Sequence, residues 1–117
     1  MLEQRLFHRV RFRAECVLNH KNITYRGQLE NIAFNGALVS FNEGLIVPQG
    51  AECTFMIYLE GEDSPLRFNV EIIHSMFTMV GITFAPYDAN TKARMYELMK
   101  AVTAEPEKLK QELQLLN

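Results

Sequence analysis

Short runs in which apolar and polar residues alternate recur along the chain, separated by turn residues. In the clearest run, 9–18, one face is apolar and the other carries arginines and a glutamate, which is the period of a half-buried strand. Further strands are predicted at 23–32, 37–41, 53–59, 66–74 and 79–84. Their short spacing favours an antiparallel barrel or sandwich over alternating strands and helices. Gly27 interrupts the second run, where we predict a bulge.

The pattern changes to a helical period after residue 84. Pro86 is expected to end the last strand, and Asp88 to cap a helix. The apolar residues of this helix recur at i, i+3, i+4 and i+7. They are Met95, Leu98, Met99 and Val102. Pro106 either interrupts this helix or starts a second one.

Beyond Pro106, apolar residues form a narrow stripe that consists of Leu109, Leu113 and Leu116. The stripe either docks on the barrel or pairs with another copy of the chain. We favour docking, and expect a monomer or a weak dimer.

The composition limits the class of protein. A chain of 117 residues that is 48% hydrophobic and 22% charged suits one globular domain. The net charge of −2 argues against a protein that wraps duplex nucleic acid. No apolar run approaches the ~18 residues that span a bilayer, and no signal-peptide pattern is present. We therefore expect a cytoplasmic protein without membrane insertion.

The two cysteines, Cys16 and Cys53, both lie in apolar alternating runs without a metal-type neighbour. Buried free thiols in a reducing compartment are the interpretation we favour over a disulfide. His8, His20 and His74 are far apart and lack the spacing of metal ligands. No phosphate-binding loop or nucleophile motif is present. The sequence therefore predicts no enzyme, no metal and no cofactor.

Positive charge gathers near the N-terminus, at Arg5, Arg9, Arg11 and Arg13. The guanidinium fork matches phosphate and can also bind a guanine edge. Each charge-assisted hydrogen bond contributes about 1.5–3 kcal/mol. Two arginines could thus supply much of the roughly 8 kcal/mol that a micromolar ligand requires. The alternative is a solvated basic strand end.

A polar turn at 31–36 offers a different capability. Asn31 carries a donor and an acceptor, which suits a purine edge. Gly36 has no side chain, so a flat ring or a backbone can approach it closely. The alternative is that both are simply good turn residues.

Together these features resemble the PilZ domain family. Residues 5–9, Arg-Leu-Phe-His-Arg, match its Arg-x-x-x-Arg motif, and residues 31–36, Asn-Ile-Ala-Phe-Asn-Gly, resemble its Asp/Asn-x-Ser-x-x-Gly motif. Residues 80–84 resemble its late strand, and a helix follows. The resemblance covers roughly residues 4–100. Arg9 and Arg13 also fit the first spacing, but we prefer Arg5 and Arg9 because the strand pattern begins just after Arg9.

The resemblance implies a mainly β fold. It is a six-stranded antiparallel β-barrel of the split-barrel type with a C-terminal α-helix, and it binds cyclic di-GMP, a bacterial second messenger. Arg5 and Arg9 would hold phosphates and guanine edges. Asn31 and its turn would bind a guanine, and Gly36 would admit the ligand. Gln4 occupies the position that influences how many ligand molecules bind.

Ala33 stands where the second motif has serine. The lost hydroxyl predicts weaker binding, by roughly tenfold or less, because a neutral hydrogen bond contributes about 0.5–1.5 kcal/mol.

We expect three parts: an N-terminal arm at 1–8 that carries the first arginine, a PilZ-like barrel and helix at 9–103, and a C-terminal helical extension at 104–117. The predicted function is a receptor or adaptor that changes conformation on binding cyclic di-GMP and signals to a protein partner. One alternative is a protein-interaction module of this fold with weak or no nucleotide binding. A lower alternative is a barrel that binds single-stranded nucleic acid, which would need a basic groove with surface aromatics.

Overall fold

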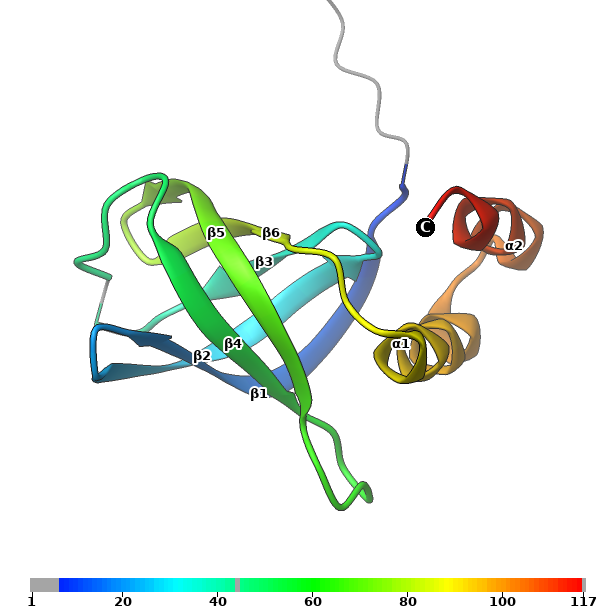
Figure 1. Ribbon diagram of the computed structural model, residues 1–117, viewed down its shortest axis with the longest axis horizontal. Helices are drawn as coiled ribbons and strands as arrows, with labels where there is room; N and C mark the ends of the chain where they lie inside the picture. Colours follow the sequence, from blue (N-terminus) through cyan, green and yellow to red (C-terminus); the bar gives the residue numbers. More distant parts are fainter. Residues whose placement is uncertain (1–6, 44, 117) are drawn as a thin grey trace, which may run out of the picture.

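The computed structural model of the protein describes residues 7–43 and 45–116, and these residues form a closed barrel followed by two helices (Figure 1). The elements are β1 (Val10–His20), β2 (Ile23–Ala33), β3 (Gly36–Ser40), β4 (Glu52–Tyr58), β5 (Leu66–Met76), β6 (Met79–Phe84), α1 (Ala89–Val102) and α2 (Pro106–Leu115). The strand order is β1-β2-β3-β6-β5-β4, with β1 paired to both β2 and β4. All neighbours are antiparallel, so the predicted six-stranded barrel is confirmed.

The alternating runs place one face of each strand inside the barrel. β5 shows this clearly, since in its first seven residues every second residue is buried while the residues between them are exposed. The buried residues of this strand are Leu66, Phe68, Val70 and Ile72. Cys16 and Cys53 are buried free thiols, as predicted. Burial, with a smaller contribution from Glu30, raises the pKa of Cys16 to about 12, so this thiol stays protonated at neutral pH.

The bulge predicted at Gly27 is wrong. Gly27 pairs with Cys16 in continuous register. The bulge of β2 lies between Leu29 and Asn31, where two residues of β2 advance against one of β3. Gly27 has a packing role instead, because a Cβ there would lie 2.6 Å from the Ser40 carbonyl oxygen and 2.7 Å from the Phe41 ring.

Helix α1 begins where the sequence predicts. The Asp88 carboxylate accepts a hydrogen bond from the Thr91 backbone N–H at 2.8 Å. This bond holds the pKa of Asp88 below its usual value. Met95 and Met99 are fully buried, and α1 packs against β1 and β5 at one end of the barrel (Figure 1). Val102, at the end of the predicted apolar face, is 42% exposed.

Pro106 starts a second helix, so the single C-terminal helix of the resemblance becomes two. Leu109 of α2 is fully buried in the common core, and Leu113 and Leu116 pack against that core. Lys92 of α1 donates a hydrogen bond to the Leu116 carbonyl oxygen at 2.8 Å. The apolar stripe thus docks within its own chain, and α2 packs mainly against α1 instead of on the strands of the barrel.

This docking predicts a sharp contrast between two leucines of α2. Leu109→Ala should lower the free energy of unfolding by about 2–5 kcal/mol, because it removes a fully buried side chain. Leu115→Ala, at a position that is 61% exposed, should change it by no more than about 0.5 kcal/mol. Urea denaturation of both variants measures the difference. Equal, small effects would contradict the docked position of α2.

Candidate functional site

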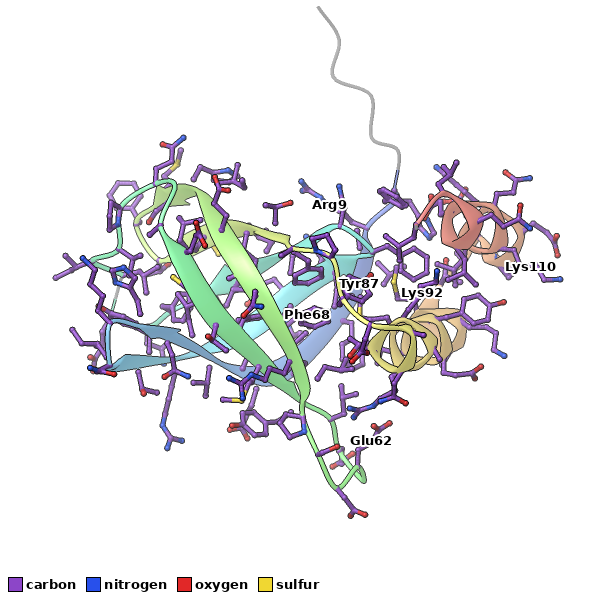
Figure 2. The ribbon with its side chains drawn as sticks, in the orientation of Figure 1. Arg9, Glu62, Phe68, Tyr87, Lys92 and Lys110 are labelled. Carbon is purple, nitrogen blue, oxygen red and sulfur yellow. The ribbon has the colours of Figure 1, made fainter. Side chains whose placement is uncertain are left out.

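The pairing of β1 with β2 brings the end of the arginine motif beside the second motif. Val10 lies opposite Ile32, and Arg11 lies opposite Asn31. Arg9 directly precedes Val10 and is exposed at the same end of the barrel as Tyr87 (Figure 2). β1 begins just after Arg9, as the preferred choice of motif requires. Arg5 and Gln4 lie outside the described residues, so their predicted roles stay predictions.

The two motifs also touch through an aromatic contact. Phe7, inside the first motif, packs edge-on against Phe34, inside the second, with ring centroids 6.2 Å apart and an interplanar angle of 85°. Phe34 is fully buried. Edge-to-face pairs of this kind add about 0.5–1.5 kcal/mol to the burial of their area. Phe7 is therefore packed on the turn that contains the second motif.

Residues at the end of the barrel's last strand, and one just after it, hold this turn in place. The Asn35 carbonyl oxygen accepts hydrogen bonds from the Phe84 backbone N–H at 2.9 Å and from Thr83 Oγ1 at 3.0 Å. The Tyr87 hydroxyl donates to the Phe34 carbonyl oxygen at 2.7 Å. Burial raises the pKa of Tyr87, which keeps the hydroxyl protonated and able to donate. Sequence reasoning missed Tyr87, because nothing near it in the chain indicates its partner.

Asn31 presents an unsatisfied acceptor at the site. Its side-chain Oδ1 is buried and has no hydrogen-bond partner among the described residues. A buried polar atom without a partner costs about 1–3 kcal/mol, so such atoms are uncommon in folded proteins. A ligand N–H donor, such as those on a guanine edge, would satisfy it.

The other two residues of the second motif are closely packed. Ala33 is 3% exposed and pairs with Gly36 across the turn. A Cβ on Gly36 would overlap the Ile82 carbonyl oxygen of β6. Gly36 is therefore required by the approach of β6, a reason that differs from the access for ligand predicted from the sequence.

Two arginines beside the turn are available to an anion. Arg9 and Arg11 are both exposed, and within 7–43 and 45–116 neither forms an ion pair. Arg13 instead lies 3.4 Å from Glu30, whose other oxygen accepts from the Ser40 hydroxyl at 2.7 Å. The positive charge nearest Asn31 is thus not neutralised by neighbouring carboxylates.

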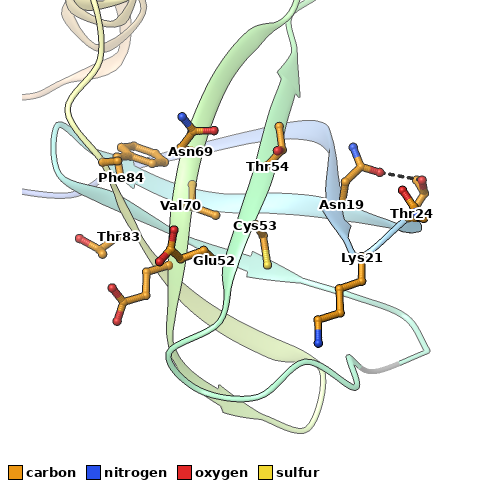
Figure 3. A pocket seen from close by; sticks show the side chains of 13 residues that line it. Asn19, Lys21, Thr24, Glu52, Cys53, Thr54, Asn69, Val70, Thr83 and Phe84 are labelled. Atoms are coloured by element: carbon orange, nitrogen blue, oxygen red, sulfur yellow. Dashed lines mark hydrogen bonds between the residues drawn. The ribbon is translucent and has the colours of Figure 1, made fainter.

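A separate groove of about 900 Å³ lies on the outer face of β4, β5 and β6 and against the β1–β2 turn (Figure 3). Thr83, which pairs with Gly36, lies at one side of it. Glu71 of β5 pairs with Thr83, and Glu52 of β4 pairs with Glu71, so both carboxylates line the groove beside Thr83. Lys21 is the only basic side chain among its lining residues. Two carboxylates repel phosphate, so we do not assign the nucleotide to this groove.

The described part of the chain contains no group of three or more His, Cys, Asp or Glu side chains that could hold a metal ion. None of its helices combines the length and apolar character needed to cross a bilayer.

A sequence profile of the PilZ domain matches residues 3–101. The chain belongs to the PilZ domain family. This match confirms the resemblance read from the two motifs, and it ends in the last turn of α1, so that α2 lies outside it. PilZ domains are receptor and adaptor domains, generally not enzymes, that bind cyclic di-GMP and partner proteins, although some members lack nucleotide binding.

Solved structures show the same fold at low sequence identity. The PilZ domain of CeSA from a cellulose-synthesizing bacterium is 15% identical with a TM-score of 0.62, over 81% of this chain and 94% of that one. The Bacillus subtilis inhibitor of motility MotI/DgrA is 13% identical with a TM-score of 0.63, over 98% of this chain and 50% of that one. An uncharacterized Legionella protein is 15% identical with a TM-score of 0.54, over 80% and 91% of the two chains. No curated protein sequence matches the chain.

The anchoring of the turn predicts a difference between two tyrosines of this PilZ domain. Tyr87→Phe should lower the free energy of unfolding by about 1–3 kcal/mol, because it leaves the Phe34 carbonyl oxygen buried without its donor. Tyr58→Phe, at a position that is 44% exposed, should have an effect below about 0.5 kcal/mol. Thermal and urea unfolding at neutral pH would compare them. If the two variants are equally stable, the Tyr87 hydroxyl does not hold the turn.

Proposed function

We propose that this protein is a cytoplasmic bacterial receptor for cyclic di-GMP that passes the signal to a protein partner. The observation that carries the proposal is the geometry at the end of the β1–β2 pairing. There, Arg11 lies opposite Asn31, and Arg9 precedes Arg11 by two residues. Within the described part of the chain, neither arginine forms an ion pair and the buried Asn31 Oδ1 has no hydrogen-bond partner. Membership of the PilZ family supports the identity of the ligand.

Each group would supply a distinct interaction with the ligand. The Arg9 guanidinium is exposed and charged, and its planar fork can bind a phosphate bidentately. Arg5, four residues before Arg9 in the motif, would supply the second guanidinium. The Asn31 Oδ1 atom would accept from the N–H donors of a guanine edge. Ala33 contributes no hydrogen bond, which weakens this site relative to one with serine.

Ligand binding would change the surface near the arm. Phe7 already contacts Phe34, so the residues just before Arg9 lie next to the second motif. A nucleotide held from both sides would draw the first motif and the turn together. This altered surface is the one that we propose a partner protein recognises.

A second candidate function is a protein-interaction module that does not bind nucleotide. The buried Ala33 favours it, because the motif serine is absent. Under this reading, Arg5→Ala and Arg9→Ala leave partner binding intact and the wild-type protein ignores cyclic di-GMP.

Calorimetric titration with cyclic di-GMP tests the proposed function. Arg9→Ala should weaken binding by about 1.5–3 kcal/mol, roughly tenfold to a hundredfold, because it removes charge-assisted hydrogen bonds to the ligand. Arg67→Ala, an exposed arginine on β5, is the matched control and should leave the affinity unchanged. Affinity should also fall as salt rises, since phosphate contacts are screened.

Absence of detectable heat with wild-type protein at tens of micromolar concentration and low salt would rule out the receptor. An unchanged affinity in Arg9→Ala would instead remove Arg9 from the site.

Restoring the motif serine gives an independent check. Ala33→Ser should tighten binding by up to about tenfold, which corresponds to the 0.5–1.5 kcal/mol of a neutral hydrogen bond. Ala37→Ser, on the neighbouring strand β3, controls for the general effect of an added hydroxyl. Affinities and melting temperatures of both variants should be measured, because position 33 is buried. Weaker binding by a fully folded Ala33→Ser variant would show that the hydroxyl is not a ligand contact.

A further inference from the structure

His8 lies between the two arginines of the first motif and is held by the C-terminal part of the chain. Its backbone N–H donates to Glu112 Oε2 at 2.9 Å, and its ring Nδ1 lies 2.9 Å from both carboxylate oxygens. Its Nε2 lies 2.9 Å from the hydroxyl of Thr103, the C-cap residue of α1. Because an ionised carboxylate can only accept, Nδ1 is the donor to Glu112. Both the backbone and the ring of His8 are therefore fixed.

This contact is buried and specific. The His8 side chain is 11% exposed and the Glu112 side chain 3%. Glu112 is the one charged residue that is buried in the described part of the chain. Among the described residues, His8 supplies the hydrogen bonds to its carboxylate. Separating the two would leave a buried charge without its partner, which is strongly unfavourable.

Glu112 lies in α2, which follows the segment that matches the family. The same helix is seated by buried Leu109 and by the hydrogen bond from Lys92 to the Leu116 carbonyl oxygen. The contact with His8 thus joins the first ligand motif to an element outside the matched segment.

We propose that Glu112 is a positioning residue for nucleotide binding: through His8 it holds the backbone immediately before Arg9, so that the packing of α2 and the affinity for cyclic di-GMP depend on each other. This inference rests on the proposed function and adds to it a regulatory element. A partner that binds α2 would thereby change the affinity of the receptor for its ligand.

The physical reason is preorganisation of the arm. Phe7 is held by Phe34 and His8 by Glu112, so two consecutive residues are fixed immediately before Arg9. An arm released from Glu112 has to be ordered again when the ligand binds, and this conformational entropy is subtracted from the binding free energy. Coupling between sites is reciprocal, so a ligand that favours the contact between His8 and Glu112 also stabilises the packing of α2.

The test compares Glu112→Ala and Glu112→Gln with Glu107→Ala, an exposed glutamate in the first turn of the same helix. In calorimetric titrations with cyclic di-GMP, Glu112→Ala should weaken binding by about fivefold to fiftyfold, within the usual range of coupling between sites. Glu112→Gln keeps the size of the side chain and should give a smaller loss. Glu107→Ala should bind like the wild type. Circular dichroism checks that each variant is folded.

Hydrogen exchange of the wild-type protein provides a second readout that needs no substitution. Cyclic di-GMP should slow exchange of the amides in 106–115, and this protection should be lost in Glu112→Ala. A His8→Ala, Glu112→Ala double-mutant cycle should be non-additive in affinity, because both changes break the same contact. A merely structural role of Glu112 would lower the melting temperature without ligand-dependent protection of α2.

The outcomes separate the two proposals. If the wild-type protein binds no cyclic di-GMP, the proposed function fails, and this inference fails with it. If the wild type binds but folded Glu112→Ala binds equally well, or if the ligand leaves exchange in 106–115 unchanged, only the inference is overturned.

Discussion

The hydrogen-bonded pairing of β1 with both β2 and β4 is the constraint on which the rest of the structure depends. It closes the barrel, and it leaves β1 without a free edge. Its register also places Arg11 opposite Asn31, with Arg9 just beyond. A shift of one residue would turn the buried face of β1 outward and move the arginines away from the second motif. The register of β1 that closes the barrel therefore also brings the residues of the candidate site together.

The turn at Phe34 and Asn35 is held by segments that are far apart in the chain. Phe7 packs on it from the arm, Thr83 bonds to it from β6, and Tyr87 bonds to it from the connection to α1. None of these three residues belongs to the specified positions of either motif. These contacts fix the turn that follows Asn31, whose buried Oδ1 has no hydrogen-bond partner among the described residues. Under the proposed function, a ligand N–H would relieve this unfavourable burial.

The contact between His8 and Glu112 extends this frame to α2. Phe7 and His8, the turn and α2 then form one connected set of packed and hydrogen-bonded residues. In such a set, a ligand at one end and a partner at the other can influence each other only if each favours one arrangement over another. In the coupling proposed above, the Glu112 carboxylate would provide that preference, because His8 satisfies it in this arrangement and separation from His8 would leave it buried without that partner.

The amino-acid sequence by itself determined the strands, the helix start at Asp88 and the two motifs, because burial of one face imposes a period and because caps act within a few residues. Tertiary structure alone decided the role of Gly27. Its missing side chain makes room for Phe41, whereas a glycine in a strand pattern had suggested a bulge. Tertiary structure also decided that Tyr87 holds the second motif and that Glu112 holds the first. These contacts join residues distant in the chain, and a single sequence carries no local pattern that pairs them.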